Sequence, residues 1–184
     1  QDVNKDGSLD IVQVGTTSGS LGVILGNGNG TLKANTTFAA GTDTQRVQLA
    51  DLNSDGNLDL VTADGADGTR SVYFGNGNGS FNARVSYAQS PLLGSAADLF
   101  LSDFNSDGNL DYAAVGAGTP GLVAALGKSA SSGDNRGSFQ AAITSVTETS
   151  ATNVRTVDVN RDGILDLVVT ENDSTISVFQ GNGN

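Results

Sequence analysis

Nine-residue segments rich in Asp and Asn occur four times in the sequence and carry side chains suited to binding a hard metal cation. In the second segment Asp51, Asn53 and Asp55 alternate along the chain, Gly56 follows, and Asp59 closes the segment. Alternate residues of such a loop can direct oxygen atoms toward a common centre, and glycine at the sixth position permits the positive φ that turns the chain around an ion. The segment therefore predicts a cation site made of oxygen ligands.

The four segments supply the same five ligand positions. Positions 1, 3, 5 and 9 are expected to contribute side-chain oxygens, and position 7 its backbone carbonyl. The apolar side chain of Ile164 at position 7 is therefore compatible with metal binding. The candidate metal ligands, segment by segment, are Asp2, Asn4, Asp6, Ser8 and Asp10; Asp51, Asn53, Asp55, Asn57 and Asp59; Asp103, Asn105, Asp107, Asn109 and Asp111; and Asp158, Asn160, Asp162, Ile164 and Asp166.

Calcium is the cation that this ligand set favours, at four sites. Calcium accepts six to eight oxygen ligands in irregular geometry, whereas magnesium suits a smaller and stricter site. Zinc and iron usually use His or Cys, and the chain has neither. An EF-hand loop closes at position 12 between helices, which differs from the acidic ninth position here. Asp-Gly and Asn-Gly pairs also form ordinary hairpin turns, but four complete copies favour metal binding.

The charge distribution supports the same interpretation. The formal net charge is −11, and twelve of the 20 acidic residues lie in the four segments. Carboxylates packed this closely repel one another unless cations neutralise them, and four divalent ions would bring −11 to −3. An acidic surface repels phosphate backbones, so nucleic-acid binding is not expected. No apolar run approaches the roughly 18–20 residues that cross a bilayer, so membrane insertion is not expected either.

Internal repetition defines the organisation of the chain. The acidic segments start at Asp2, Asp51, Asp103 and Asp158, and each is followed by a glycine-containing marker of the type Gly-Asn-Gly-Asn-Gly, beginning at Gly26 in the first repeat. In the third repeat the marker is replaced by a stretch that is six residues longer and spans 127–137. We predict one domain, 1–184, made of repeats at about 1–43, 44–94, 95–151 and 152–184.

Short strands are expected within every repeat. In the second repeat the runs 46–50, 58–63, 70–74 and 81–87 are rich in apolar or alternating residues and are bounded by Gly, Asn and Asp. No stretch keeps the apolar spacing of a helix. Four strands in a repeat of about 50 residues are typical of a propeller blade, so the predicted fold is an all-β propeller of four-stranded antiparallel blades.

The first and last blades are expected to be incomplete. Gln1 stands where the leading strand of the first blade should end, and Asn184 lies in the turn before the last strand of the fourth blade. Folded proteins avoid open sheet edges. We therefore expect flanking sequence or a neighbouring subunit to supply the missing strands.

The acidic segment, the strand after it and the glycine marker together resemble FG-GAP/VCBS repeats. Leu58-Asp59-Leu60-Val61 and Phe74-Gly75-Asn76-Gly77-Asn78-Gly79 carry the resemblance in the second repeat, and it covers essentially the whole chain. It implies a calcium-binding propeller of the integrin α-subunit type, with about seven blades in the parent protein. It also implies that the Asp and Asn positions named above are structural calcium ligands.

The expected function is that of an extracellular binding or adhesion module for a glycan or a protein, because weak calcium sites suit extracellular calcium levels. The alternatives are an accessory or catalytic domain of a secreted polysaccharide-acting enzyme, or a structural repeat of a surface fibre. No catalytic constellation is visible, since the chain lacks His and the remaining candidates form no known pattern: Asp64, Asp67, Asp98, Arg46, Arg155, Tyr87 and Tyr112. Ligand contacts are expected in the variable segments 65–69, 116–121 and 128–136.

Overall fold

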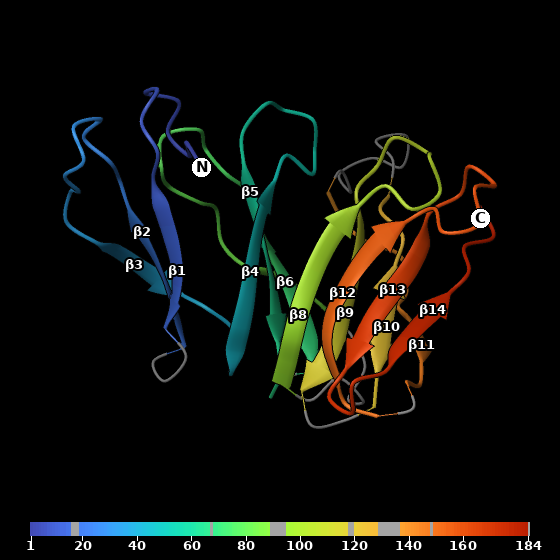
Figure 1. The fold of residues 1–184 in the computed structure, drawn as a ribbon. Helices are drawn as coiled ribbons and strands as arrows, with labels where there is room; N and C mark the ends of the chain where they lie inside the picture. Colours follow the sequence, from blue (N-terminus) through green and yellow to red (C-terminus); the bar gives the residue numbers. More distant parts are fainter. Residues whose placement is uncertain are drawn as a thin grey trace.

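The computed structural model describes residues 1–15, 19–66, 68–88, 95–117, 120–128, 137–147 and 149–183. The described residues form fourteen β-strands in four antiparallel sheets, which confirms the all-β prediction (Figure 1). No helix long and apolar enough to cross a membrane occurs in these ranges.

Each sheet is a meander of consecutive strands and corresponds to one sequence repeat. Blade 1 contains β1 (Ile11–Gly15), β2 (Ser20–Ile24) and β3 (Thr36–Ala39). Blade 2 contains β4 (Thr44–Ala50), β5 (Asp59–Asp64), β6 (Thr69–Tyr73) and β7 (Val85–Ala88). Blade 3 contains β8 (Ser95–Ser102), β9 (Asp111–Ala117), β10 (Leu122–Ala125) and β11 (Ile143–Ser145). Blade 4 contains β12 (Ala151–Val157), β13 (Asp166–Glu171) and β14 (Ile176–Phe179).

The blades stand side by side and touch through their first strands (Figure 1). β4 packs beside β8, and β8 beside β12, so these three strands form a common inner edge. The last strands, β3, β7 and β11, lie at the opposite edge of their sheets and are mostly exposed. This arrangement is consistent with the blades of a propeller.

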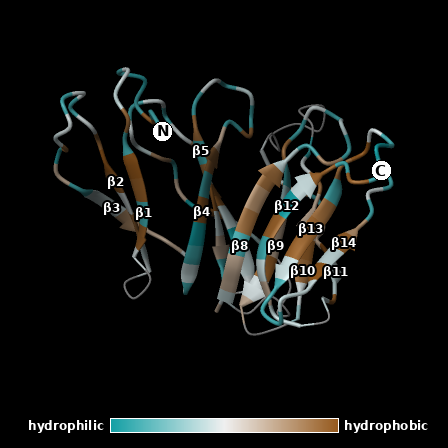
Figure 2. Cartoon of the chain, viewed as in Figure 1, coloured by the Kyte–Doolittle hydropathy of each residue, from teal (hydrophilic) through white to brown (hydrophobic). Residues whose placement is uncertain are grey.

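Burial follows the position of a strand within its blade. Every residue of β5 is buried, because this strand lies in the middle of blade 2 with a neighbouring blade on each side. Its buried residues are apolar except for Asp59, Thr62 and Asp64. Figure 2 shows hydrophobic residues concentrated along the strands and hydrophilic residues in the connecting loops.

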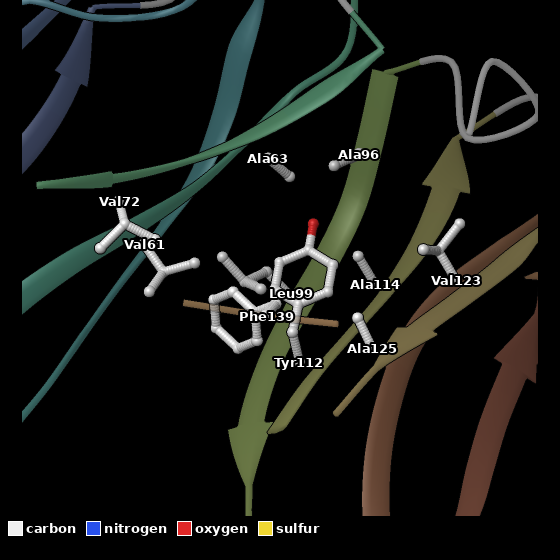
Figure 3. Packing of buried hydrophobic residues seen from close by; sticks show 10 residues of the cluster. All are labelled: Val61, Ala63, Val72, Ala96, Leu99, Tyr112, Ala114, Val123, Ala125 and Phe139. Carbon is white, nitrogen blue, oxygen red and sulfur yellow. The ribbon is translucent and has the colours of Figure 1, made fainter. Parts of the chain in front are cut away.

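Hydrophobic cores form between neighbouring blades. The core between blades 2 and 3 includes Val61, Val72, Leu99, Tyr112 and Phe139, which point toward one another in Figure 3. Smaller cores join blades 1 and 2, around Leu21, Leu60 and Tyr73, and blades 3 and 4, around Val115, Val154 and Val169. Each blade therefore depends on its neighbours for burial of its apolar faces.

The glycine marker forms a tight turn that packs against the acidic segment of its own repeat. Its first glycine pairs with an apolar residue beyond the turn in three blades, as Gly26 with Leu32, Gly75 with Phe81 and Gly127 with Phe139. A Cβ on Gly75 would lie 2.1 Å from the carbonyl oxygen of Leu58, so a larger residue does not fit there. The pairing persists in blade 3, although the inserted residues 129–136 lie outside the described residues.

A buried arginine lies in the core between blades 2 and 3. Arg70 is 1% exposed, and its guanidinium lies 5.3–5.8 Å from the ring centroids of Tyr87, Tyr112 and Phe139. It donates hydrogen bonds to the carbonyl oxygens of Ala88 (3.1 Å) and Gln140 (2.7 Å). Burial lowers the pKa of Arg70 from its usual value, but an arginine stays charged in practice.

Replacing Arg70 should test how much this arrangement stabilises the blade interface. Arg70→Ala should lower the free energy of unfolding by about 2–4 kcal/mol, because it leaves a cavity and two carbonyls without their donor. Arg70→Leu should cost less, since Leu21 faces the outer strand at the equivalent register of blade 1. Urea denaturation measures both variants, with the exposed Arg46→Ala as control. Equal losses in all three variants would contradict this account.

Candidate metal centres

The four acidic loops lie at one end of the sheets, the upper end in Figure 1. In blades 2 to 4 each loop joins the first strand to the second, and in blade 1 the loop leads into β1. The first two loops are in contact, because Lys5 Nζ in the first loop donates a 2.7 Å hydrogen bond to Asn57 Oδ1 in the second. The repeats therefore place all predicted ligand residues on one end of the molecule, and all of them lie within the described residues.

Two residues with positive φ shape every loop. The glycine at position 6 has a φ of 84–86°, as predicted from the sequence. Position 4 also adopts a left-handed conformation, with a φ of 58–62°, and is occupied by Lys5, Ser54, Ser106 and Arg161. Sequence reasoning missed position 4, since Lys, Ser and Arg share no preference for this conformation. The two left-handed residues together fold nine residues into a compact turn.

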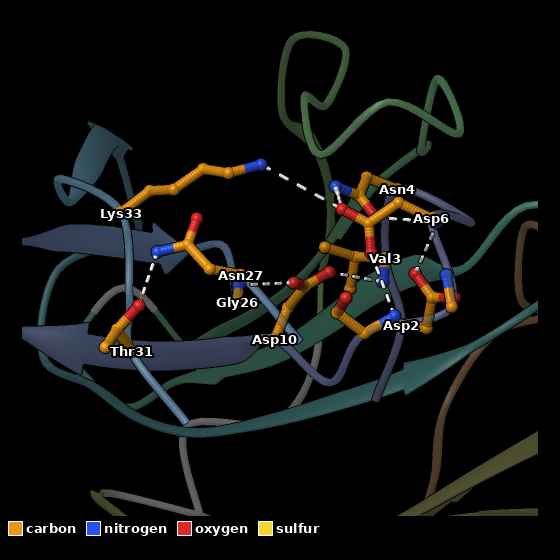
Figure 4. Close-up of polar contacts among 11 residues, drawn as sticks. Asp2, Val3, Asn4, Asp6, Asp10, Gly26, Asn27, Thr31 and Lys33 are labelled. Atoms are coloured by element: carbon orange, nitrogen blue, oxygen red, sulfur yellow. Dashed lines mark hydrogen bonds and ion pairs between the residues drawn. The ribbon is translucent and has the colours of Figure 1, made fainter. Parts of the chain in front are cut away.

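Side chains at positions 1, 3 and 5 gather around the backbone of the same loop (Figure 4). In the first loop Asp2 accepts hydrogen bonds from the amides of Asp6 (3.2 Å) and Gly7 (2.9 Å). Asn4 accepts from the amide of Asp6 (3.0 Å), and Asp6 accepts from the amide of Ser8 (2.8 Å). The other three loops repeat these bonds.

The aspartate at position 9 joins the loop to the glycine turn. Asp59 is fully buried, and its two carboxylate oxygens accept hydrogen bonds from the amides of Leu52 (2.9 Å) and Gly75 (2.8 Å). Asp10, Asp111 and Asp166 make the equivalent pairs of bonds. The sequence analysis did not predict this clamp, the pair of hydrogen bonds by which the position-9 aspartate joins the loop to the glycine turn. The spacing of the two residues in the sequence could have indicated it. The aspartate and the glycine that it binds are 15 or 16 residues apart in every repeat.

The carboxylates at positions 5 and 9 have opposite electrostatic environments. Burial raises the pKa of Asp59 and Asp111 above the usual range. The hydrogen bond from Asn4 lowers the pKa of Asp6. At Asp55 slight burial acts to raise the pKa, but hydrogen bonds from Asn57 and Asn53 outweigh it and the pKa is lowered. An exposed, ionised carboxylate at position 5 is therefore available to a cation at neutral pH.

The donor chemistry of the loops fits a hard cation such as calcium. All the predicted ligand atoms are oxygens, and a carboxylate oxygen that accepts one amide hydrogen bond retains a further lone pair for a metal. No group of three or more acidic, His or Cys residues in the described part of the chain is close enough together to hold a metal ion. A cation in these loops would accordingly draw on the Asn amide oxygens and the position-7 carbonyls as well as on carboxylates.

The residues considered for catalysis bind other residues of the chain. Asp64 is fully buried and accepts hydrogen bonds from Thr44 (2.6 Å), Thr62 (2.9 Å) and Ser71. Arg84 lies 3.9 Å from the same carboxylate. These bonds use the carboxylate as a structural acceptor inside blade 2.

The other candidates are placed in two groups. Asp98 and Arg155 form an ion pair between the inner strands β8 and β12, where Arg155 also lies over the ring of Phe100 at 5.3 Å. Tyr87 and Tyr112 flank Arg70. The guanidinium of Arg46 donates a hydrogen bond to the backbone carbonyl of Gln45. Asp67 lies outside the described residues.

The variable segments lie at different ends of the blades. The backbone amide of Gly68 donates a hydrogen bond to the carbonyl of Gly65 after β5, and that of Gly116 to the carbonyl of Gly121 at the end of β9. Both bonds lie at the end opposite the acidic loops. Lys128 and Ser138 flank the insertion of blade 3, and the backbone amide of Lys128 donates a 2.9 Å hydrogen bond to the carbonyl of Ser138. This pair lies beside Gly127, at the same end of the blades as the acidic loops. Residues 67, 118–119 and 129–136 of these segments lie outside the described residues.

The fold and the four loops define an all-β repeat protein with propeller-like blades. The family model of the FG-GAP-like repeat matches residues 2–62 and 51–114, which together exceed half of the chain. The chain therefore belongs to the FG-GAP-like repeat family. No curated protein gives a significant match.

Two solved structures share the fold. One is a lectin of Agrocybe aegerita described as specifically recognising non-reducing terminal N-acetylglucosamine, with 20% sequence identity and a TM-score of 0.57. The other is BBS1N, solved in complex with ARL6DN, with 9% identity and a TM-score of 0.58. The alignments cover 100% and 99% of this chain but only 51% and 55% of the two neighbours. The chain thus spans about half the length of each.

Proposed function

We propose that the chain is a calcium-stabilised, extracellular, non-catalytic module that binds a glycan. The observation that carries the proposal is the fourfold repetition of one loop geometry, in which oxygen ligands surround the same pair of left-handed residues. Weak calcium sites of this kind are filled at extracellular calcium concentrations. The ions would neutralise the acidic end and leave the other surfaces for ligand contacts.

Two further observations support a binding role over catalysis. A structural neighbour is a glycan-binding lectin, which makes a glycan the first ligand class to test. The acids and tyrosines considered for catalysis act as partners of buried or interfacial groups, as Asp64 does for Thr44 and Asp98 for Arg155. The four blades would form part of a larger propeller of about seven blades, in keeping with the length of the two neighbours.

A panel of immobilised glycans tests the proposal. The purified chain, at about 1 mM calcium, should bind a subset of neutral glycans, lose them when a chelator is added, and bind again when calcium is restored. Binding should exceed that of an unrelated acidic protein of similar net charge. Absence of binding to every glycan, with calcium present and the protein folded, would refute the assignment of a glycan ligand.

A further inference from the structure

Neighbouring blades share a groove at their outer side, and Arg70 fills the groove between blades 2 and 3. The walls are the last strand of blade 2, which ends at Ala88, and the segment around Gln140 in blade 3. The guanidinium of Arg70 crosses from one wall to the other and donates hydrogen bonds to a backbone carbonyl on each side. Tyr87 and Phe139 supply aromatic faces on the two walls.

The corresponding groove between blades 1 and 2 has the same walls but a different central residue. Leu21 faces Phe38 in β2 and β3 at the same register at which Arg70 faces Tyr87 in β6 and β7. Leucine is shorter than arginine and carries no donor. Nothing on this residue can therefore reach the carbonyls of the two walls.

Those carbonyls belong to Ala39 and Asn82. Ala39 occupies the position of Ala88, since both lie opposite the first residue of the preceding strand. Asn82 occupies the position of Gln140, since both directly follow the aromatic residue that pairs with the glycine turn. Two carbonyls that accept hydrogen bonds from Arg70 in one groove thus have equivalents in the other groove, where Leu21 offers no donor.

A cavity of about 410 Å³ lies in this groove, within the size range of small-molecule sites. It is lined by residues of both blades: Phe38, Ala39, Ala40, Tyr73, Phe81, Asn82, Ala83 and Arg84. The rings of Phe38 and Phe81 have centroids 5.5 Å apart and form an apolar wall. The lining includes Ala39 and Asn82, whose carbonyls are the equivalents of those that Arg70 binds in the other groove.

A buried hydroxyl at this cavity lacks a partner. Tyr73 is 2% exposed, and its phenol oxygen has no hydrogen-bond partner within the described residues, although Thr62 and Ser71 are near. Burial raises the pKa of Tyr73 to about 12, so the hydroxyl is protonated and can donate at neutral pH. A buried polar group without a partner is costly, and a bound ligand would satisfy it.

We propose that this cavity binds one neutral pyranose ring of a glycan. The hydroxyls of the sugar would donate to the carbonyls of Ala39 and Asn82 and accept from Tyr73, while its apolar face would pack against Phe38 and Phe81. Arg84 at the wall disfavours a cationic ligand, and the net charge of −11 disfavours an anionic one. This inference rests on the proposed glycan-binding function and assigns it to one site.

Two substitutions test the cavity: one fills it with the side chain found in the neighbouring groove, and the other removes the hydroxyl donor of Tyr73. Leu21→Arg introduces the side chain that occupies the groove between blades 2 and 3, and should weaken binding at least tenfold by excluding the sugar. Tyr73→Phe removes only the hydroxyl and should weaken binding about threefold to tenfold, because one hydrogen bond is lost. Tyr87→Phe removes a hydroxyl from the filled groove and should leave binding unchanged.

The measurement is titration of the calcium-loaded chain with methyl glucopyranoside, methyl galactopyranoside and methyl mannopyranoside, followed by amide NMR shifts. At least one should shift the amides of Ala40 and Ala83, and glucosamine and glucuronate should bind more weakly. Unchanged binding in both folded Leu21→Arg and folded Tyr73→Phe would overturn the proposal. If Leu21→Arg does not fold, Tyr73→Phe alone decides.

The experiments distinguish failure of this cavity as the binding site from failure of the proposed glycan-binding function. Glycan binding on the immobilised panel that is unaffected by both Leu21→Arg and Tyr73→Phe would preserve the glycan-binding function and refute this site. Panel binding that is weakened about threefold to tenfold in Tyr73→Phe, with the melting temperature unchanged, would support the site. A shift of Ala40 and Ala83 by a pyranoside, without binding to any panel glycan, would support the cavity and contradict the broader function.

Discussion

Removal of calcium is expected to lower the free energy of unfolding by roughly 5–6 kcal/mol. A site with a dissociation constant of about 0.1 mM, at about 1 mM calcium, stabilises the folded state by about 1.4 kcal/mol through linkage. Four such sites give the stated total, which is comparable with the whole stability of a typical domain. The chelated chain should therefore be much less stable than the calcium-loaded chain.

Thermal melts with calcium, with magnesium and with a chelator measure this effect. The melting temperature should fall steeply with chelator, recover on addition of excess calcium, and recover little with magnesium, which suits a smaller site. A melting curve that does not change with chelator would rule out structural calcium.

Asp59→Ala is expected to destabilise the chain by about 2–4 kcal/mol in chelator, and by about 1.4 kcal/mol more in calcium. The buried carboxylate accepts the amides of Leu52 and Gly75, and both amides would lose their partner. Asp55→Ala should behave differently, because this side chain is exposed and acts within its own loop. It should cost about 1.4 kcal/mol or somewhat more in calcium and about 0.5 kcal/mol or less in chelator.

Urea denaturation of both variants, each in calcium and in chelator, separates the two roles. Asp59→Asn is the matched control, since its amide oxygen keeps one acceptor, and it should lose about half as much stability as Asp59→Ala. If chelator abolished the cost of Asp59→Ala, position 9 would act mainly as a metal ligand. The structural clamp would then be the wrong explanation.

The elements that the sequence predicts well are those set by local chemistry. Gly56 was expected to adopt a positive φ, and the run 58–63 was expected to form a strand, and both are confirmed. The expectation that FG-GAP repeats build the chain is confirmed by the family match. These features follow from residue type and spacing within one repeat.

Features that depend on contacts between distant segments could not be predicted. The bonds of Asp59 to Leu52 and Gly75 join two sequence markers that were interpreted separately. Arg70 was not singled out, because nothing local shows that a charged side chain will be buried between Tyr87 and Phe139. The difference between Arg70 and Leu21 acquires meaning only when the registers of two sheets are compared.

The number of calcium ions bound per folded chain tests the central claim most directly. Equilibrium dialysis against about 1 mM calcium, followed by metal analysis, should give close to four ions per chain, and about one ion fewer for Asp55→Ala. Fewer than one ion per folded chain, or an unchanged number in Asp55→Ala, would contradict the assignment of the four acidic loops as calcium sites.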